Sequence, residues 1–196
     1  MDIRALRNII DRPASQKGAA LGQSRNNETS TAVFALVFSE VVKHCQSLSS
    51  DVQGFERRLA ELGRDVGLRL HLLIWLNDKN AKRETCLLNA LYYVHQSFYK
   101  AAFGMAADSL ERSNQNQGEF MIVDNNPLVA KYVSCPRDLG ALNVSAFIAG
   151  MLEAVLSAIQ FPATVSAHLQ PVDGMPNRTK FLLTFSQDIL DREANI

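Results

Sequence analysis

A stretch of apolar residues at helical spacing, from Leu59 to Leu76, constrains the fold more than any other part of this chain. Its apolar residues follow three- and four-residue steps, at Leu59, Leu62, Val66, Leu70 and Leu73. These steps place the side chains on one stripe of an α-helix, so they predict a long helix with one buried face. From His71 to Leu76 the polar side nearly disappears, which indicates a helix end covered by its own domain and by a partner.

Two glycines interrupt this predicted helix on a neighbouring stripe. Gly63 and Gly67 are four residues apart and therefore lie one above the other on the helix surface. Each costs roughly 1 kcal/mol of helix propensity relative to alanine. Because glycine has no Cβ atom, another backbone can approach closely at both positions. The pair therefore predicts tight packing of a second element, and a second subunit is one candidate for that element.

An apolar segment ahead of this helix predicts another helix, capped by Ser30 or Thr31 and running to Leu48. Apolar residues occupy two rows on it rather than one. The first row is Phe34, Phe38, Val41, Cys45 and Leu48, and the second is Val33, Leu36, Val37 and Val42. Either one row faces a partner subunit or both rows belong to the core of the chain. The predicted interface residues are Phe34, Phe38, Val41, Val42, Cys45, Gly63, Val66, Gly67 and Leu70.

The remaining chain mixes helical and alternating patterns. Helical periodicity predicts a helix from Thr85 to Gly104 and another over Val144–Gln160 that ends before Pro162. Strands are predicted at Phe120–Val123, Leu128–Val133, Thr164–Gln170 and Phe181–Phe185, followed by a helical turn at Asp188–Glu193. The first two strands form a hairpin around Asn125-Asn126-Pro127. The fold class is therefore α+β, with helices packed on one face of a small antiparallel sheet.

Length and charge narrow the class of protein. The 196 residues accommodate a flexible N-terminal arm, 1–28, and a single domain, 29–196. Twenty basic and twenty acidic residues cancel without any long run of one sign, which argues against binding nucleic acid or an anionic membrane surface. The cysteines are odd in number and scattered, as is typical of the reducing cytoplasm. The longest apolar run, 144–161, contains Glu153 and is too short to span a bilayer.

The sequence contains no recognisable catalytic, cofactor or metal motif. A Walker loop, a GxGxxG turn and an HExxH helix are all missing. Three cysteines and four histidines occur, but their spacing matches no nucleophilic site. Asp124-Asn125-Asn126 indicates a turn rather than a calcium loop, because the bidentate glutamate that such a loop needs does not follow. We therefore expect no enzyme activity, no cofactor and no metal.

Several blocks in the same order resemble the small α/β subunits of the TRAPP vesicle-tethering complex, and the subunit-five type most strongly. They include FALVFSEVVKHCQ (34–46), RLAELGRDVGLRL (58–70), DNNPLV (124–129) and LNVSAFIAGMLEAVLSAIQFPATVSAH (142–168). The resemblance covers about 31–186. It implies several helices on one face of a four-stranded antiparallel sheet, which agrees with the fold class expected from the residues alone.

The resemblance also implies a function and partners. Members of the family pair side by side through their first helices, and the assembled complex promotes nucleotide exchange on a Rab GTPase of early secretory traffic. This chain would then be a non-catalytic scaffold that pairs with the acylated small subunit and meets the GTPase and the membrane only through the complex. Its location would be the cytoplasm, peripheral to endoplasmic reticulum and cis-Golgi membranes.

One position departs from the acylated relative. That relative carries its lipid on a cysteine a few residues before a Arg-Glu-Thr motif, whereas here Lys79 stands four residues before Arg83. A buried cation beside an acyl chain is costly, so we expect no tunnel-bound acyl group. An alternative function is a sensor of small hydrophobic ligands, with the helix Ala146–Ile159 lining an apolar pocket.

Overall fold

A computed structural model describes residues 30–78, 82–114, 116–133 and 142–194. The predicted arm, 1–28, and Lys79 lie outside the described residues, as does Cys135. Helices and strands follow one another along the chain in the order α2, α3, α4, η1, α5, β1, β2, α6, α7, β3, β4 and α8. This is the α+β composition that the sequence predicts.

Two long helices open the described part of the chain. Helix α2 spans Thr31–Ser47, and the Ser30 side chain accepts a hydrogen bond from the Ala32 N–H at its start. Helix α3 spans Val52–Asn77, with the Asp51 carboxylate accepting from the Gly54 N–H. Such caps satisfy backbone donors that have no partner within the helix. The helix predicted from Leu59 to Leu76 is confirmed and extends back to the Asp51 cap.

The third helical region consists of three consecutive parts with different helical geometry. It consists of α4 (Leu87–Tyr92), the π-helical turn η1 (Tyr93–Phe98) and α5 (Tyr99–Phe103). It ends at Gly104, whose φ of 84° is a left-handed conformation that favours glycine. The predicted start at Thr85 is wrong by two residues. The Glu193 carboxylate, from α8 (Gln187–Ala194), accepts the Leu87 N–H at 2.8 Å and so caps α4 from a distant part of the chain.

Four antiparallel strands form one sheet in the order β1-β2-β4-β3. Their bounds are β1 Ser109–Arg112, β2 Glu119–Asp124, β3 Ala163–Leu169 and β4 Thr179–Phe185. Opposite Ile122 in β2 lies Phe181 in β4, and opposite Val165 in β3 lies Leu183. These side chains share the face that the helices cover, so the sheet contributes one apolar layer to the core.

The predicted first hairpin is wrong in its second strand. Residues Leu128–Lys131 form a short helix, α6, which Pro127 precedes as its N-cap. Pro127 has no N–H to donate to a strand, and its carbonyl accepts from the Ala130 and Lys131 N–H groups at 3.0 and 3.1 Å, which outweighs the β propensity of the valines that follow. The strand that pairs with β2 is instead β1, across the polar loop 113–118. The predicted Asp124 turn is confirmed, since the carboxylate accepts the Asn126 N–H at 2.9 Å.

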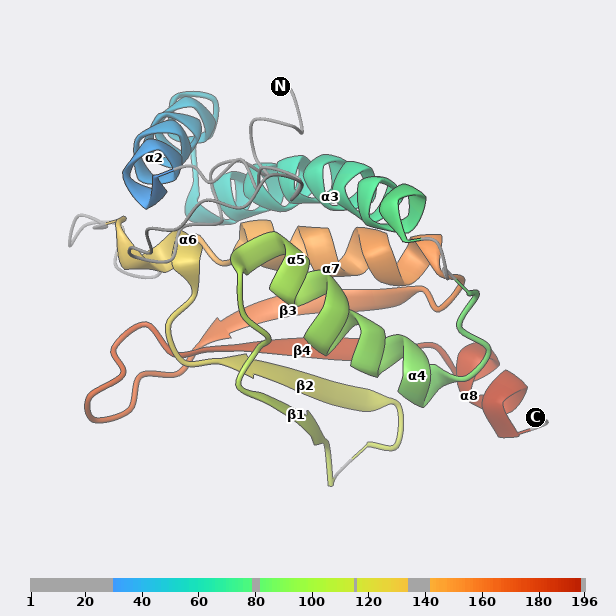
Figure 1. Cartoon of the computed structure of the whole chain (residues 1–196). Coiled ribbons are helices and arrows are strands. Elements are labelled where there is room, and N and C mark those ends of the chain that lie inside the picture. Colours follow the sequence, from blue (N-terminus) through green and yellow to red (C-terminus); the bar gives the residue numbers. More distant parts are fainter. Residues whose placement is uncertain (1–29, 79–81, 115, 134–141, 195–196) are drawn as a thin grey trace.

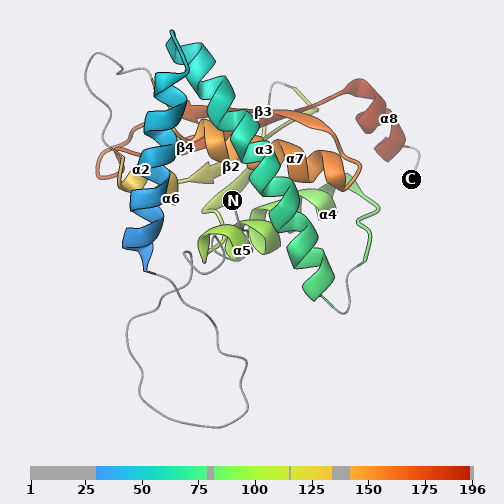
Figure 2. The same cartoon turned by 90° about the horizontal axis from the view of Figure 1, so that it is seen from above.

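The helices form layers above the sheet (Figure 1). Helix α7, Ala146–Ala158, and the α4–α5 region lie on the sheet, α3 lies over α7, and α2 is outermost. Seen from above, α2 and α3 diverge from their connection in a V (Figure 2). Within the described residues, no helix combines the length and the apolar content that crossing a membrane requires.

Candidate subunit interface

Helices α3 and α7 touch through their backbones. A Cβ atom added at Gly67 would lie 2.6 Å from the Met151 Cα, and one at Gly63 would collide with the Phe147 carbonyl group. From the other side, a Cβ atom at Gly150 of α7 would collide with the Ala60 backbone. All three glycines are buried. The close approach predicted at Gly63 and Gly67 is therefore real, and α7 of the same chain makes it.

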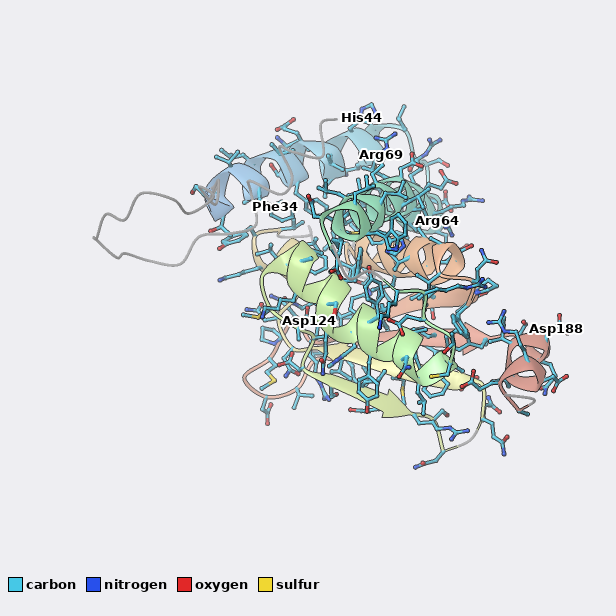
Figure 3. The ribbon with its side chains drawn as sticks, turned by 45° about the vertical axis from the view of Figure 1, so that its right-hand side comes forward. Phe34, His44, Arg64, Arg69, Asp124 and Asp188 are labelled. Atoms are coloured by element: carbon cyan, nitrogen blue, oxygen red, sulfur yellow. The ribbon has the colours of Figure 1, made fainter. Side chains whose placement is uncertain are left out.

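An ion pair closes one edge of this contact. The Arg64 guanidinium donates from Nε and Nη2 to one carboxylate oxygen of Glu153, at 3.1 and 3.0 Å. Figure 3 shows Arg64 on the side of α3 that faces α7. The pair is partly exposed, so its contribution to stability is small, but its geometry aligns the two helices.

Helix α2 packs through aromatic side chains. The Phe34 and Phe38 rings are stacked with centroids 5.7 Å apart, and Phe38 meets Phe147 of α7 edge to face at 5.4 Å. Phe34, Phe38 and Cys45 are the buried residues of this helix. Phe34, Phe38 and Cys45 of the first predicted row therefore anchor α2 to the rest of the domain.

The second row of α2 is only partly covered, because Val37 and Val42 are half-buried whereas Val33 and Leu36 are exposed. Leu36 is 69% exposed, and Leu48, at the end of the first row, is exposed as well. On α3, Leu68, Leu72 and Leu76 are also exposed. Large exposed aliphatic side chains are typical of surfaces that another protein covers.

A small notch lies between the two helices. Its volume is about 20 Å³, and its walls are Phe34, Val37, Phe38, Val41, Leu62, Val66 and Phe147. This volume is close to that of a single water molecule. The notch is therefore too small for an organic ligand, and an apolar side chain from another chain is the kind of group that would cover it.

The predicted interface residues fall into two sets. Six are buried within the chain: Phe34, Phe38, Cys45, Gly63, Gly67 and Leu70. Their packing partners are α3 and α7 for the aromatic residues and α7 for the glycines, so they hold the domain together. Val41, Val42 and Val66 are half-buried, and for them contact with a partner remains a prediction. The sequence pattern missed that Leu36, in the second row, is the most exposed of the α2 residues named here.

In the part of the chain that the structure describes, the cysteines and histidines do not assemble a reactive site. Burial raises the pKa of the Cys45 thiol, which keeps it protonated and unreactive. His44, its neighbour, is exposed and lies on the outer side of α2 (Figure 3). His44 and Cys45 point in different directions because they are adjacent residues of one helix. Among the described residues, no group of three or more His, Cys, Asp or Glu side chains is placed to hold a metal ion.

A larger pocket lies at the far end of α3. Its volume is about 460 Å³, and its apolar walls include Leu72, Trp75 and Ile159. A hydrogen bond of 2.9 Å joins His71 Nδ1 to the Tyr93 hydroxyl beside it. Burial lowers the pKa of His71 and, together with the negative charges of Glu84 and Asp78, raises the pKa of Tyr93 to about 12. Both groups are therefore neutral near pH 7.

Comparison with known proteins identifies the relatives of this chain. The sequence model of the family described as transport protein particle (TRAPP) component matches residues 34–186. Trafficking protein particle complex subunit 5 of Dictyostelium discoideum is 39% identical over 188 residues, covering 95% of this chain and 97% of that protein. The human protein of the same name is 40% identical over 174 residues, covering 89% of each chain.

A solved structure has the same fold. It is the crystal structure of a trafficking protein particle complex subunit 3 from Naegleria fowleri, covalently bound to palmitic acid. The TM-score is 0.66 with 18% sequence identity, over 79% of this chain and 94% of that one. At this identity the likeness shows the fold. The family model and the relatives show the family as well as the fold. This chain therefore belongs to the TRAPP component family.

Proposed function

We propose that this chain is a non-catalytic scaffold subunit of a TRAPP complex. It pairs through the outer side of α2 and α3 with the acylated small subunit, and it supports Rab GTPase nucleotide exchange only through the assembled complex. Its place is cytoplasmic, peripheral to endoplasmic reticulum and Golgi membranes, in vesicle transport between them. Family membership supports the general role, and the surface of α2 and α3 supports the mode of pairing.

The observation that carries the proposal is the partly covered apolar row beside the notch. Leu36 and Val33 project from the outermost helix of the domain, while the neighbouring Val41 and Val66 line the notch and are half-buried. No core function explains Leu36 at 69% exposure. A partner helix laid along α2 and α3 would cover this row and place a side chain over the notch, as interfaces with an apolar centre do.

Co-expression with the acylated small subunit tests the pairing. We expect a one-to-one heterodimer by light scattering on a sizing column. Leu36→Asp should weaken the heterodimer about tenfold or more, because a carboxylate would be buried against apolar groups. The isolated variant should keep the wild-type circular dichroism spectrum, since Leu36 is exposed.

A matched substitution separates this surface from a general effect of charge. Leu169 at the end of β3 is 51% exposed and lies on a different element. Leu169→Asp should leave the heterodimer intact. A wild-type chain that stays monomeric beside the acylated subunit would refute the pairing. Full binding by Leu36→Asp would place the interface elsewhere.

The scaffold role has its own measurement. Fluorescent nucleotide release from the Rab GTPase should proceed at the spontaneous rate with the isolated chain and faster with the complete complex. Exchange activity in the isolated chain would contradict the non-catalytic part of the proposal. It would leave the pairing result unaffected.

A further inference from the structure

Two hollows meet along one irregular segment of the chain. The 460 Å³ pocket at the end of α3 and a second hollow of about 220 Å³ share Arg83, Glu84 and Gln160 as lining residues. Both hollows lie along the segment 82–85, which is neither helix nor strand: Lys82 lines the first hollow and Thr85 the second. We call the joined hollow the 82–85 groove. Its lining includes Trp75, Tyr93 and Ile159 at one end and Phe161 and Arg192 at the other.

The groove combines apolar walls with a cationic rim. Lys82, Arg83 and Arg192 line it and are exposed, whereas Glu84 is the single carboxylate in the lining and is half-buried. No ion pair involves Lys82 or Arg83 within the described part of the chain. Arg192 is held in place, because it donates to the Gln160 carbonyl at 2.8 Å and lies over the Phe161 ring. The rim therefore complements a ligand that carries carboxylates.

The backbone of the segment is also available for binding. Among the described residues, Lys82–Thr85 makes no backbone–backbone hydrogen bond. Unpaired backbone groups at an exposed segment are the partners that another peptide uses when it binds alongside. An acyl chain has no donors or acceptors for them. Four residues reach at most about 14 Å, which limits the contact to a short peptide.

We infer that the 82–85 groove binds a short acidic peptide segment of another protein. A large apolar side chain of this peptide enters the pocket against Trp75 and Ile159, and a neighbouring Asp or Glu meets Arg83. The peptide backbone runs beside the 82–85 segment. Leu72 of α3 lines the groove and is also one of the exposed leucines of that helix. The two proposals are still tested separately, because Leu36 does not line the groove and Arg83 is not on α2 or α3.

The single tryptophan of the chain provides the measurement. Trp75 is 53% exposed and lines the groove, so its fluorescence emission should shift to the blue when a side chain covers it. Short random peptides displayed on phage are first selected on the immobilised full-length chain. The selected sequences are then synthesised and titrated against Trp75 emission, in parallel with dispersed palmitate.

We expect the selected peptides to share a large apolar residue next to Asp or Glu. Arg83→Glu should weaken their binding about tenfold or more, and a peptide with Lys in place of the acid should recover part of the loss. Lys100→Glu is the control, since Lys100 is exposed on α5 and lines neither hollow. Its binding should equal that of the wild type.

Three results would overturn the inference. The first is a selection that enriches no sequence or enriches sequences without carboxylates. The second is binding that Arg83→Glu leaves unchanged. The third is a blue shift of Trp75 with palmitate and none with the peptides, which would assign the groove to a lipid.

Discussion

Helix α3 meets its two neighbouring helices in different ways. Against α7 the contact is made by glycines, and the two backbones touch at Gly63, Gly67 and Gly150. Against α2 it is made by the large side chains Phe34 and Phe38, and a notch remains between the helices. The first contact has no space left in it. The α2–α3 contact is packed on the side that faces the domain, where Phe34 and Phe38 are buried, and it leaves a notch.

The difference separates the interior of this domain from its candidate binding surface. A contact between backbones fits one partner in one geometry, because no side chain can rotate to adapt. A contact between side chains leaves apolar residues at its margin that are only partly covered. Val41 and Val66 are half-buried in this way. We therefore expect substitutions in the α3–α7 contact to unfold the domain and substitutions in the α2–α3 contact to act locally.

The largest effect is expected at the glycine contact. Gly63→Val would place a branched Cβ atom against the Phe147 carbonyl group, and the chain would lose about 4 kcal/mol or more of unfolding free energy. Urea denaturation followed by circular dichroism measures this. The control is Ala32→Val, exposed on α2, which should cost roughly 0.5 kcal/mol of helix propensity. Equal losses of unfolding free energy for the two variants would mean that the stability of the domain does not depend on the close contact between α3 and α7.

A smaller and local effect is expected at the aromatic contact. Phe38→Ala removes a buried ring that touches Phe34 and Phe147, at a cost of about 3 kcal/mol. Hydrogen exchange should accelerate roughly a hundredfold for the amides of α2, since 1.36 kcal/mol corresponds to a factor of ten. The amides of α7 should remain protected. Equal acceleration in α2 and α7 would show that the two contacts unfold as one unit.

The smallest effect concerns the reactivity of Cys45. Its thiol is buried and its pKa is raised by desolvation, although the charge of Arg58 on α3 opposes the shift. Only the thiolate reacts, so iodoacetamide should modify Cys45 about tenfold more slowly than the less buried Cys86. Because the pKa of Cys45 is raised, its rate of modification should keep increasing with pH even above the ordinary pKa of a cysteine thiol.

Mass spectrometry of tryptic peptides separates the two cysteines. In Phe38→Ala the Cys45 rate should rise towards that of Cys86, which would confirm that α2 opens without the rest of the domain. An unchanged Cys45 rate in that variant would indicate that Phe38 does not hold α2 in place.

Predictions from the sequence succeeded where a local pattern determines the structure. Helix α3 was predicted because its apolar residues repeat at helical spacing, β3 because Val165 and its apolar neighbours two residues apart alternate with polar residues, and β4 because Phe181, Leu183 and Phe185 recur at every second position. The predicted strand at Leu128–Val133 failed because Pro127 starts a helix there. Strand β1 was missed because Ser109–Arg112 is only four residues long and mostly polar, so that pairing with β2 rather than its own composition makes it a strand.

The sequence by itself determined that Gly63 and Gly67 need a close backbone neighbour and that α2 carries two apolar rows. Only the tertiary structure decided that α7 is this neighbour and that the buried residues of α2 belong to the row containing Phe38. The physical reason is that helical spacing defines the faces of a helix, whereas the element that covers each face lies far away in the chain. Gly63 and the Phe147 backbone that it meets are joined by packing alone, and no local pattern encodes that meeting.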